Sequence, residues 1–417
     1  MTKSLAVWWD QDIVGTLKLN RTGRLSFGYS PEWLMNPGQP AVSLSLPKRE
    51  QRFSERECRP FFAGLLPEDE QLDIVAAALG LSKQNNFALL TALGGDVAGA
   101  LTLWPGDQRP PAIQIHNGPK ALDERELAKL LETLPKSPLL VGQKDLRLSL
   151  AGAQPKLPVV VVNQAVALPE RGQPTTHILK PPIARFDATT ENEALVMRLA
   201  ARIGLDVAQV ETRTAAGRSY LLVTRYDRRT TGTGSVQRLH QEDFCQALGI
   251  APEYKYEAEG GPTFADSFSL LRRASSRPAV DILKLLDAAI FNLVVGNSDA
   301  HGKNFSLLYV DGEIRLAPLY DLLSTMAYPE LSPRLAMRIG KRAELHEMGI
   351  KTWPQFAEST GLSTPFVVRR VRAISQAVGD TVIAVVGEFA PPLNIAALNR
   401  YAALIQTRAA RALSTAA

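Results

Sequence analysis

The sequence predicts an α+β protein with two lobes, a first lobe rich in strands and a second lobe that is helical. Short apolar runs typical of strands follow one another through residues 146–228, with one helical stretch between them. After residue 228 the apolar residues recur at helical spacing in several stretches. Ionisable motifs gather near the junction of these two regions, which is where a two-lobed nucleotide enzyme places its cleft.

A smaller N-terminal subdomain is expected before the two lobes. The first hundred residues show three short strands, two helical stretches and another strand. A segment rich in Pro and Gly follows at 105–120, and its lack of periodicity favours a boundary there. The expected parts are an N-terminal subdomain at 1–106, the rest of the first lobe at 107–226 and an all-helical C-terminal lobe at 227–417.

Composition is that of an ordinary globular protein, with 417 residues, 45% hydrophobic and 21% charged. No apolar run reaches the ~18 residues that span a bilayer, and the N-terminus lacks the apolar core of a secretory signal. The cysteines Cys58 and Cys245 match no metal spacing and are expected to be reduced. We therefore expect a cytoplasmic protein without membrane contact. The net charge of +5 is compatible with binding of nucleic acid or nucleotide phosphates.

A strongly apolar helix at 281–296 leads into a polar loop that contains Asp299 and Asn304. The five-residue step between them equals that of the protein-kinase catalytic loop, in which the Asp takes the proton of the substrate hydroxyl and the Asn holds magnesium. Asn297 and Ser298 stand where that loop has His and Arg. A solvated polar loop with a capping Asp explains this segment alone equally well.

A second aspartate, Asp321, ends a hydrophobic run that predicts a strand. It occupies the place of the D-F-G aspartate of protein kinases, the main magnesium ligand. Asn304 and Asp321 would supply hard oxygen ligands, which suit magnesium. Lys303 could stabilise a γ-phosphate with its ammonium group. The alternative is that Asp321 caps the next short helix.

A lysine at a strand end and a carboxylate on the helix of the first lobe are also needed in a kinase. Lys180 ends the apolar run "THILK", and Glu193 lies on the helix that follows, with Glu191 as the competing choice. A buried lysine requires a partner, which Glu193 could supply while Lys180 binds the α- and β-phosphates. Taken alone, Lys180 is better explained as a lysine that reaches solvent at a strand end.

The candidate phosphate loop lies between two predicted strands. Its small side chains would let backbone N–H groups approach phosphate oxygens closely. It lacks both the Walker A and the G-x-G-x-x-G patterns, so an ordinary β-turn remains the alternative. Ser149, just ahead of it, is a hydroxyl placed to be modified or to bind phosphate. The loop consists of Ala151, Gly152, Ala153, Gln154, Pro155 and Lys156.

The segment "LLVTRYDRR" follows the last strand of the first lobe, at the position of a kinase hinge. Backbone groups of Thr224 and Arg225 could bind adenine, Tyr226 could pack on its ring, and Asp227 could reach the ribose. A charged strand end is the alternative. The order of phosphate loop, lysine, glutamate, hinge and aspartates is far less probable by chance than any single motif.

Together these motifs resemble the HipA serine/threonine kinases, the toxin halves of bacterial toxin–antitoxin pairs. The resemblance implies a two-lobed protein-kinase-like fold of the PI3/4-kinase type, with a kinase core at about 145–345. It extends from the first strand to about residue 345. The motifs that carry it are "FFAGLLPE", "GGDVAGALTLWP", "SLAGAQPK", "HILK", "TRYDR", "LHQEDFCQALG", "KYE" before "GGP", "NSDAHGKNFS", "PLYD" and "LAMRIG".

The resemblance implies a role for each matching residue. Asp299 would be the catalytic base, Asn304 and Asp321 would hold Mg²⁺, and Lys180 would contact the phosphates of ATP. Ser149 matches the family's autophosphorylation site, and its phosphorylation would expel the phosphate loop and inactivate the kinase. The remaining nucleotide-binding residues would be the loop 151–156, Thr224, Arg225, Tyr226, His301, Gly302, Lys303 and Tyr320.

The resemblance also implies partners. Family members phosphorylate aminoacyl-tRNA synthetases, with glutamyl-tRNA synthetase the first choice, which stalls translation and favours persistence. They pair with HipB, a small helix-turn-helix antitoxin that binds operator DNA. Thr224 replaces a hinge Glu of some members, and Pro155 replaces an acidic loop residue. Two alternatives remain: a kinase-fold enzyme for another protein or a small molecule, and a non-catalytic co-repressor subunit.

Overall fold

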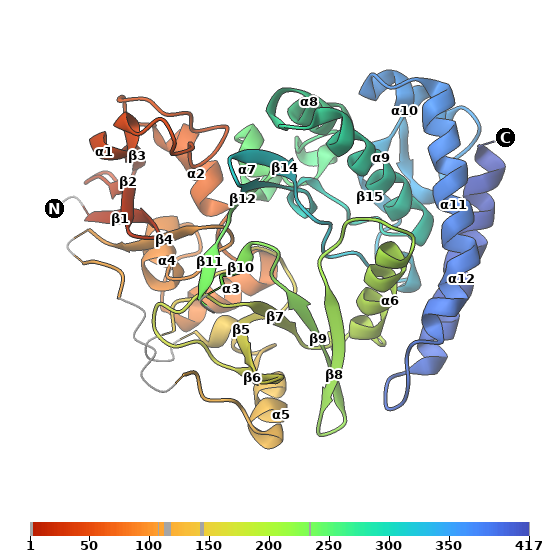
Figure 1. Ribbon diagram of the computed structural model, residues 1–417, viewed down its shortest axis with the longest axis horizontal. Coiled ribbons are helices and arrows are strands. Elements are labelled where there is room, and N and C mark those ends of the chain that lie inside the picture. The colour runs from red at the N-terminus through yellow and green to blue at the C-terminus, as the bar shows by residue number, and fades with distance from the viewer. Residues whose placement is uncertain (1–2, 107, 112–117, 142–145, 233–234, 417) are drawn as a thin grey trace. The chain divides into compact units, whose positions relative to one another are not determined.

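The chain folds into two compact units (Figure 1). The computed structural model describes residues 3–106, 108–111, 118–141, 146–232 and 235–416. The first unit comprises Met1–Pro181 and Thr224–Glu253, and the second comprises Pro182–Val223 and Tyr254–Ala417. The α+β class is confirmed, since helices and strands occur in both units.

The N-terminal part of the first unit is built on an antiparallel sheet in the order β3-β2-β1-β4. Alternate side chains of these strands point to opposite faces. One face joins a large aromatic core that includes Phe27, Phe53, Phe61 and Phe62. The strands are β1 (Lys3–Trp9), β2 (Asp12–Leu19), β3 (Leu25–Tyr29) and β4 (Leu101–Pro105).

A second antiparallel sheet in the first unit contains β6, β5 and β7, with β5 in the centre. Short helices and a two-stranded ribbon complete the unit. The remaining strands are β5 (Leu157–Val162), β6 (Ala165–Ala167), β7 (His177–Lys180), β10 (Arg228–Thr230), β11 (Val236–Arg238) and β12 (His240–Asp243). The helices are α1 (Pro31–Met35), α2 (Glu55–Ala63), α3 (Asp69–Ala78), α4 (Asn86–Leu93), α5 (Glu124–Thr133) and α7 (Phe244–Leu248).

The second unit is organised around α9 (Pro278–Val295), whose C-terminal half is buried on all sides. Gly296 ends this helix with φ 80°, as the sequence predicts, and Pro278 opens it three residues before the expected start at 281. The long helices α11 and α12 pack against each other and against α9 (Figure 1). The other helices are α6 (Thr189–Arg202), α8 (Phe264–Ala274), α10 (Thr352–Thr360), α11 (Thr364–Val386) and α12 (Ile395–Thr415).

Strands also occur in the second unit, so the description of the region after residue 227 as all-helical was too strong. Asp311 and Gly312 both have positive φ and form the tight turn between β13 and β14. An Asp-Gly pair between apolar runs is a strong hairpin signal. Conversely, residues 146–150 are not part of a β-strand, and among them Leu148 alone makes a single parallel bridge, with Asp96. The strands are β8 (Val210–Ala215), β9 (Arg218–Thr224), β13 (Ser306–Val310), β14 (Glu313–Leu316), β15 (Arg334–Ile339) and β16 (Arg342–Glu344).

Within the described part of the chain, no helix is both long and apolar enough to cross a membrane.

Candidate active site

The loop that carries Asp299 is fixed by the end of α9 and by backbone contacts on both sides. The hydroxyl of Thr325 donates to the carbonyl of Gly296 at 3.0 Å and accepts from the N–H of Ser298 at 2.8 Å. The carbonyl of Ser298 accepts from the N–H of Ala336, on β15, at 2.8 Å. Asp299 comes next and its side chain is exposed. A buried scaffold therefore holds an accessible carboxylate, as a catalytic group requires.

The side chains of Asn304 and Asp321 lie in contact, as expected if both bind one magnesium ion. The amide nitrogen Nδ2 of Asn304 lies 3.2 Å from Oδ2 of Asp321. The N–H of His301 donates to Oδ1 of Asn304 at 3.1 Å and to the carbonyl of Asp299 at 2.8 Å. One short turn thus links Asp299 to Asn304. Asp321 has φ 59°, a left-handed conformation that costs energy for a non-glycine residue and is common at functional sites.

Lys303 and Tyr320 pack on the same turn. Lys303 is buried, and its carbonyl accepts a hydrogen bond from the hydroxyl of Tyr320 at 2.7 Å. The same hydroxyl lies 2.7 Å from Oγ of Ser306. Tyr320 therefore connects the segment before Asp321 to the loop that carries Asn304. Its expected contact with a nucleotide remains a prediction.

The oxygen donors of this turn fit magnesium. Among the residues that the structure describes, no group of three or more His, Cys, Asp or Glu side chains is placed to hold a metal. A site that depends on thiolates, imidazoles or several carboxylates is thus not found there. The side chains of Asn304 and Asp321 contact each other through the amide nitrogen of Asn304, and each also carries an oxygen that could bind a metal. Magnesium commonly uses one or two carboxylates and completes its shell with phosphates and water.

The candidate phosphate loop is folded back on itself in the first unit. The ammonium of Lys156 donates to the carbonyl of Ala151 at 2.8 Å. Gly152 has φ 115°, and a Cβ atom at this position would lie 2.3 Å from Nζ of Lys156. The carbonyl of Gly152 accepts from the N–H of Glu68 at 3.3 Å. The positive φ favours glycine at position 152, and the loop is attached to the segment that precedes α3.

Ser149 is completely buried, with 0% of its surface exposed. Its hydroxyl donates to the carbonyl of Leu65 at 2.6 Å, and its N–H donates to the carbonyl of Asp96 at 2.9 Å. In this conformation the hydroxyl cannot reach an ATP molecule. Any phosphorylation of Ser149 requires residues around 149 to leave this position first.

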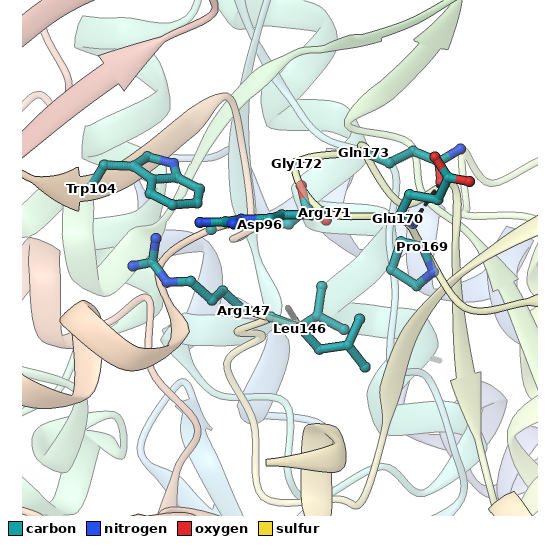
Figure 2. Close-up of a pocket in the computed structure, with 11 residues that line it drawn as sticks. Asp96, Trp104, Leu146, Arg147, Pro169, Glu170, Arg171, Gly172 and Gln173 are labelled. Atoms are coloured by element: carbon teal, nitrogen blue, oxygen red, sulfur yellow. Dashed lines mark hydrogen bonds between the residues drawn. The ribbon is translucent and has the colours of Figure 1, made fainter. Parts of the chain in front are cut away.

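A pocket in the first unit is lined in part by Leu146, Arg147 and Leu148, the three residues that precede Ser149 in the sequence (Figure 2). The guanidinium carbons of Arg147 and Arg171 lie 4.2 and 5.7 Å from the ring centroid of Trp104. Nη2 of Arg147 also donates to the carbonyls of Thr91 and Leu103, at 2.6 and 2.9 Å. Burial, together with the charge of Arg171, lowers the pKa of Arg147 to about 10. None of the predicted nucleotide-binding residues lines this pocket.

The segment predicted as a hinge is part of a buried ion network in the first unit. Asp96 accepts hydrogen bonds from Arg225 at 3.2 Å and from Arg228 and Arg238 at 3.0 Å. Although burial acts to raise it, these arginines hold the pKa of Asp96 well below its usual range. Burial, with a contribution from the neighbouring Arg225, lowers the pKa of Arg228 to about 10. The three arginines share two carboxylates, those of Asp96 and Asp227, so the network carries more cations than carboxylates.

The same network changes the interpretation of the hinge residues. The guanidinium of Arg225 also bonds to Asp227, and its N–H donates to the carbonyl of Thr176 at 3.0 Å. Asp227 accepts in addition from the N–H of Gly99 at 2.8 Å and from the side chain of Gln241 at 3.1 Å. The expected contact of Asp227 with ribose has no support, because its oxygens serve the protein interior. Nucleotide contacts of Thr224, Arg225 and Tyr226 remain predictions.

Lys180 and Glu193 are both buried, with 5% and 2% of their surface exposed. Lys180 ends β7 in the first unit, and Glu193 lies in α6 in the second. Their pairing stays a prediction. Glu191, the competing choice, uses its carboxylate locally, since it accepts from the hydroxyl of Thr190 at 2.6 Å.

Two residues of interest were missed by the sequence analysis. The hydroxyl of Tyr256 donates to Oδ1 of Asp299 at 3.0 Å across 43 positions of sequence. Asp96 is the centre of the buried network, although it lies far from Arg225 and Arg238 in the chain. Motif spacing in the sequence gives no signal for contacts between residues so far apart in the chain. Their motifs, "KYE" and "GGDVAG", were noted without a role for either residue.

Comparison with known proteins identifies the family. A family model described as the HipA-like C-terminal domain matches residues 148–385, more than half of the chain. A second model, the HipA N-terminal domain, matches residues 5–104. This chain belongs to the HipA family. Both HipA models fall on segments that the sequence motifs had singled out.

Relatives of this HipA-family chain are named as kinases. It is 57% identical over 412 residues to a putative kinase, Y4mE, from Sinorhizobium fredii, with 97% of each chain covered. It is 30% identical to the serine/threonine-protein kinase toxin HipA of Shewanella oneidensis, with 92% of this chain and 89% of that protein covered. Kinase chemistry implies use of a nucleotide, commonly with a divalent metal.

A solved structure confirms the fold. The chain superimposes with a TM-score of 0.85 on a HipA from Shewanella oneidensis, at 28% identity, covering 98% of this chain and 97% of the other. That structure is a complex of HipA with HipB and its operator DNA. The two-lobed HipA fold expected from the sequence is thereby shown.

Proposed function

We propose that this HipA-family protein is an ATP-dependent serine/threonine protein kinase and a growth-inhibiting toxin. The observation that carries the proposal is the turn of the second unit that joins an exposed carboxylate, Asp299, to the paired side chains of Asn304 and Asp321. The order and spacing are those of a kinase catalytic loop followed by a metal-binding aspartate. The kinase names of the relatives support the same reaction class.

The proposed chemistry is transfer of the γ-phosphoryl group of ATP to a serine or threonine hydroxyl. Asp299 accepts the proton of the hydroxyl as the oxygen bonds to the γ-phosphorus, and the bond to the β-phosphate oxygen breaks to release ADP. When bound, Mg²⁺ at Asn304 and Asp321 neutralises phosphate charge. Lys303 contributes positive charge from the same turn. In the first unit, Lys180 and loop 151–156 bind phosphates, and residues 224–226 bind adenine.

Substitution of the metal-binding aspartate gives the first prediction. Asp321→Asn removes the negative ligand but keeps an oxygen and tolerates the left-handed backbone. We expect the Mg²⁺ concentration for half-maximal phosphate transfer to rise by on the order of tenfold or more. The measurement is the rate of phosphate incorporation across a Mg²⁺ titration at fixed ATP.

Asp311→Asn is the matched control, because Asp311 is another aspartate with positive φ, placed in the β13–β14 turn. It should leave the Mg²⁺ dependence unchanged. An unchanged dependence in Asp321→Asn as well would contradict the assignment of Asp321 as a metal ligand.

Autophosphorylation on Ser149 is the second prediction. A phosphate adds about two negative charges at neutral pH, and Ser149 has no exposed surface to hold them. Phosphorylated Ser149 must therefore leave Leu65, and loop 151–156 must leave with it. We expect mass spectrometry to find phosphate on Ser149 after incubation with Mg-ATP. We also expect the phosphorylated chain to lose activity and to be cut faster by protease near residue 151.

Ser149→Ala tests the link between modification and inactivation. The variant should remain active during a long incubation with Mg-ATP while the wild type loses activity. A wild-type chain that stays fully active after stoichiometric phosphorylation at Ser149 would contradict this regulation.

We further propose an aminoacyl-tRNA synthetase as the substrate, glutamyl-tRNA synthetase first, so that phosphorylation inhibits translation and promotes persistence. Support comes from membership of the HipA family. A HipB-like helix-turn-helix antitoxin is the proposed partner and links the chain to operator DNA. The HipA that superimposes on this chain was solved with HipB and operator DNA, which supports this assembly.

A further inference from the structure

Tyr256 contacts the proposed catalytic base directly. Its phenolic hydroxyl donates to Oδ1 of Asp299 at 3.0 Å. Its ring packs edge-on against His301, with ring centroids 5.3 Å apart and an angle of 80° between planes. Tyr256 thus meets the Asp299–Asn304 turn at both its first residue and its middle. All three residues belong to the second unit.

The backbone around Tyr256 is tightly folded. Its carbonyl accepts hydrogen bonds from the N–H groups of Glu259 and Gly261, both at 2.9 Å. A Cβ atom on Gly261 would lie 2.7 Å from the Tyr256 carbonyl oxygen and 2.4 Å from that of Tyr254. Only glycine can approach so closely at position 261. The turn therefore holds the tyrosine backbone in one position.

The next residue connects this turn to the scaffold of the catalytic loop. The carboxylate of Glu257 accepts from both the N–H and Nε of Arg338 on β15, each at 2.6 Å. On the same strand, the N–H of Ala336 donates to the carbonyl of Ser298, the residue before Asp299. The contacts form a closed circuit from Tyr256 through Glu257 and β15 to residues 298–299, and back through the Tyr256 hydroxyl.

We propose that Tyr256 is a positioning residue for the phosphoryl transfer. Its hydroxyl fixes the rotation of the Asp299 carboxylate, so that the base meets the acceptor hydroxyl in one orientation. This inference rests on the proposed kinase function and assigns part of it to a residue outside the catalytic loop. Misplacement of a catalytic group by about 1 Å can cost on the order of a hundredfold in rate.

Tyr256→Phe removes the hydroxyl and keeps the ring against His301. We expect the maximal rate of phosphate incorporation at saturating Mg-ATP to fall by on the order of tenfold. The ATP concentration for half-maximal rate should stay unchanged, because the ring and the turn remain. A thermal unfolding midpoint equal to that of the wild type would show that the fold is intact.

Two further variants separate the hydroxyl from the ring. Tyr254→Phe removes the hydroxyl of an exposed tyrosine two positions away and should keep the wild-type rate. Tyr256→Ala removes ring and hydroxyl together and should be at least as slow as Tyr256→Phe. Full activity in Tyr256→Phe, with loss only in Tyr256→Ala, would assign the effect to packing and overturn the inference.

A faster reaction in Tyr256→Phe would overturn it too, because the hydroxyl would then compete with the acceptor for Asp299. If the wild type incorporated no phosphate at all, the proposed kinase function would fail, and the inference with it. Incorporation in the wild type with an equal rate in Tyr256→Phe would overturn the inference alone.

Discussion

Asp299→Asn is expected to reduce phosphate transfer by about a thousandfold, because it removes a general base while leaving the shape of the side chain. Asp299 is exposed, backbone groups and Thr325 hold its loop, and the oxygen of an Asn side chain can still accept the hydrogen bond from Tyr256. The fold should therefore survive. The check is the initial rate of phosphate incorporation from labelled ATP, with thermal unfolding measured on the same preparation.

Asp380→Asn provides the matched control, since Asp380 is an exposed aspartate on α11 that bonds to the side chain of Gln376. It should behave as wild type. Growth inhibition on expression should likewise disappear in Asp299→Asn and persist in Asp380→Asn. Toxicity that survived in Asp299→Asn would favour a binding or co-repressor role for the chain over catalysis.

Asp96→Ala is expected to destabilise the first unit by about 3–5 kcal/mol, because it removes one of the two carboxylates that balance three buried guanidinium groups. Asp96 is 2% exposed and bonds to Arg225, Arg228 and Arg238. Its hydroxyl partner, Thr175, lies at 2.7 Å. Urea unfolding of the full chain, followed by tryptophan fluorescence because Trp104 lies in this unit, provides the measurement.

The control for Asp96→Ala is Glu253→Ala, which breaks the partly exposed pair between Arg59 and Glu253 in the same unit. Exposed pairs contribute about 0–1 kcal/mol, so a small change is expected. Equal stability of the two variants would show that the buried network is not a major support of this unit.

Much of the fold was predictable because local signals agree with the tertiary structure. The apolar helix expected at 281–296 ends at its glycine as predicted, whereas it starts three residues earlier than expected, at Pro278. A strand was expected in the run before Asp321, and the Asp-Gly turn that joins β13 to β14 there is a hairpin signal of the same kind. Residues 146–150 alternate like a strand, yet they extend alongside Asp96 without a ladder of their own.

The candidate site was predictable only where its residues are close in sequence or follow a known order. Asp299, Asn304 and Asp321 satisfy both conditions, and the second unit brings the last two within hydrogen-bond distance. The hinge reading of Asp227 failed because a charged strand end looks the same whether it faces a ligand or a buried counter-ion. The sequence gives no signal that Tyr256 contacts Asp299, because the two residues are far apart in the chain and are brought together only by folding.

The central claim is that this HipA-family chain transfers phosphate to protein hydroxyl groups in the cell. The most direct measurement is a quantitative phosphoproteome after brief expression of the wild type and of Asp299→Asn at equal protein levels. The account predicts a phosphoserine in an aminoacyl-tRNA synthetase, together with phosphorylated Ser149, in the wild-type sample alone. Identical phosphoproteomes, with growth inhibited only by the wild type, would contradict the account.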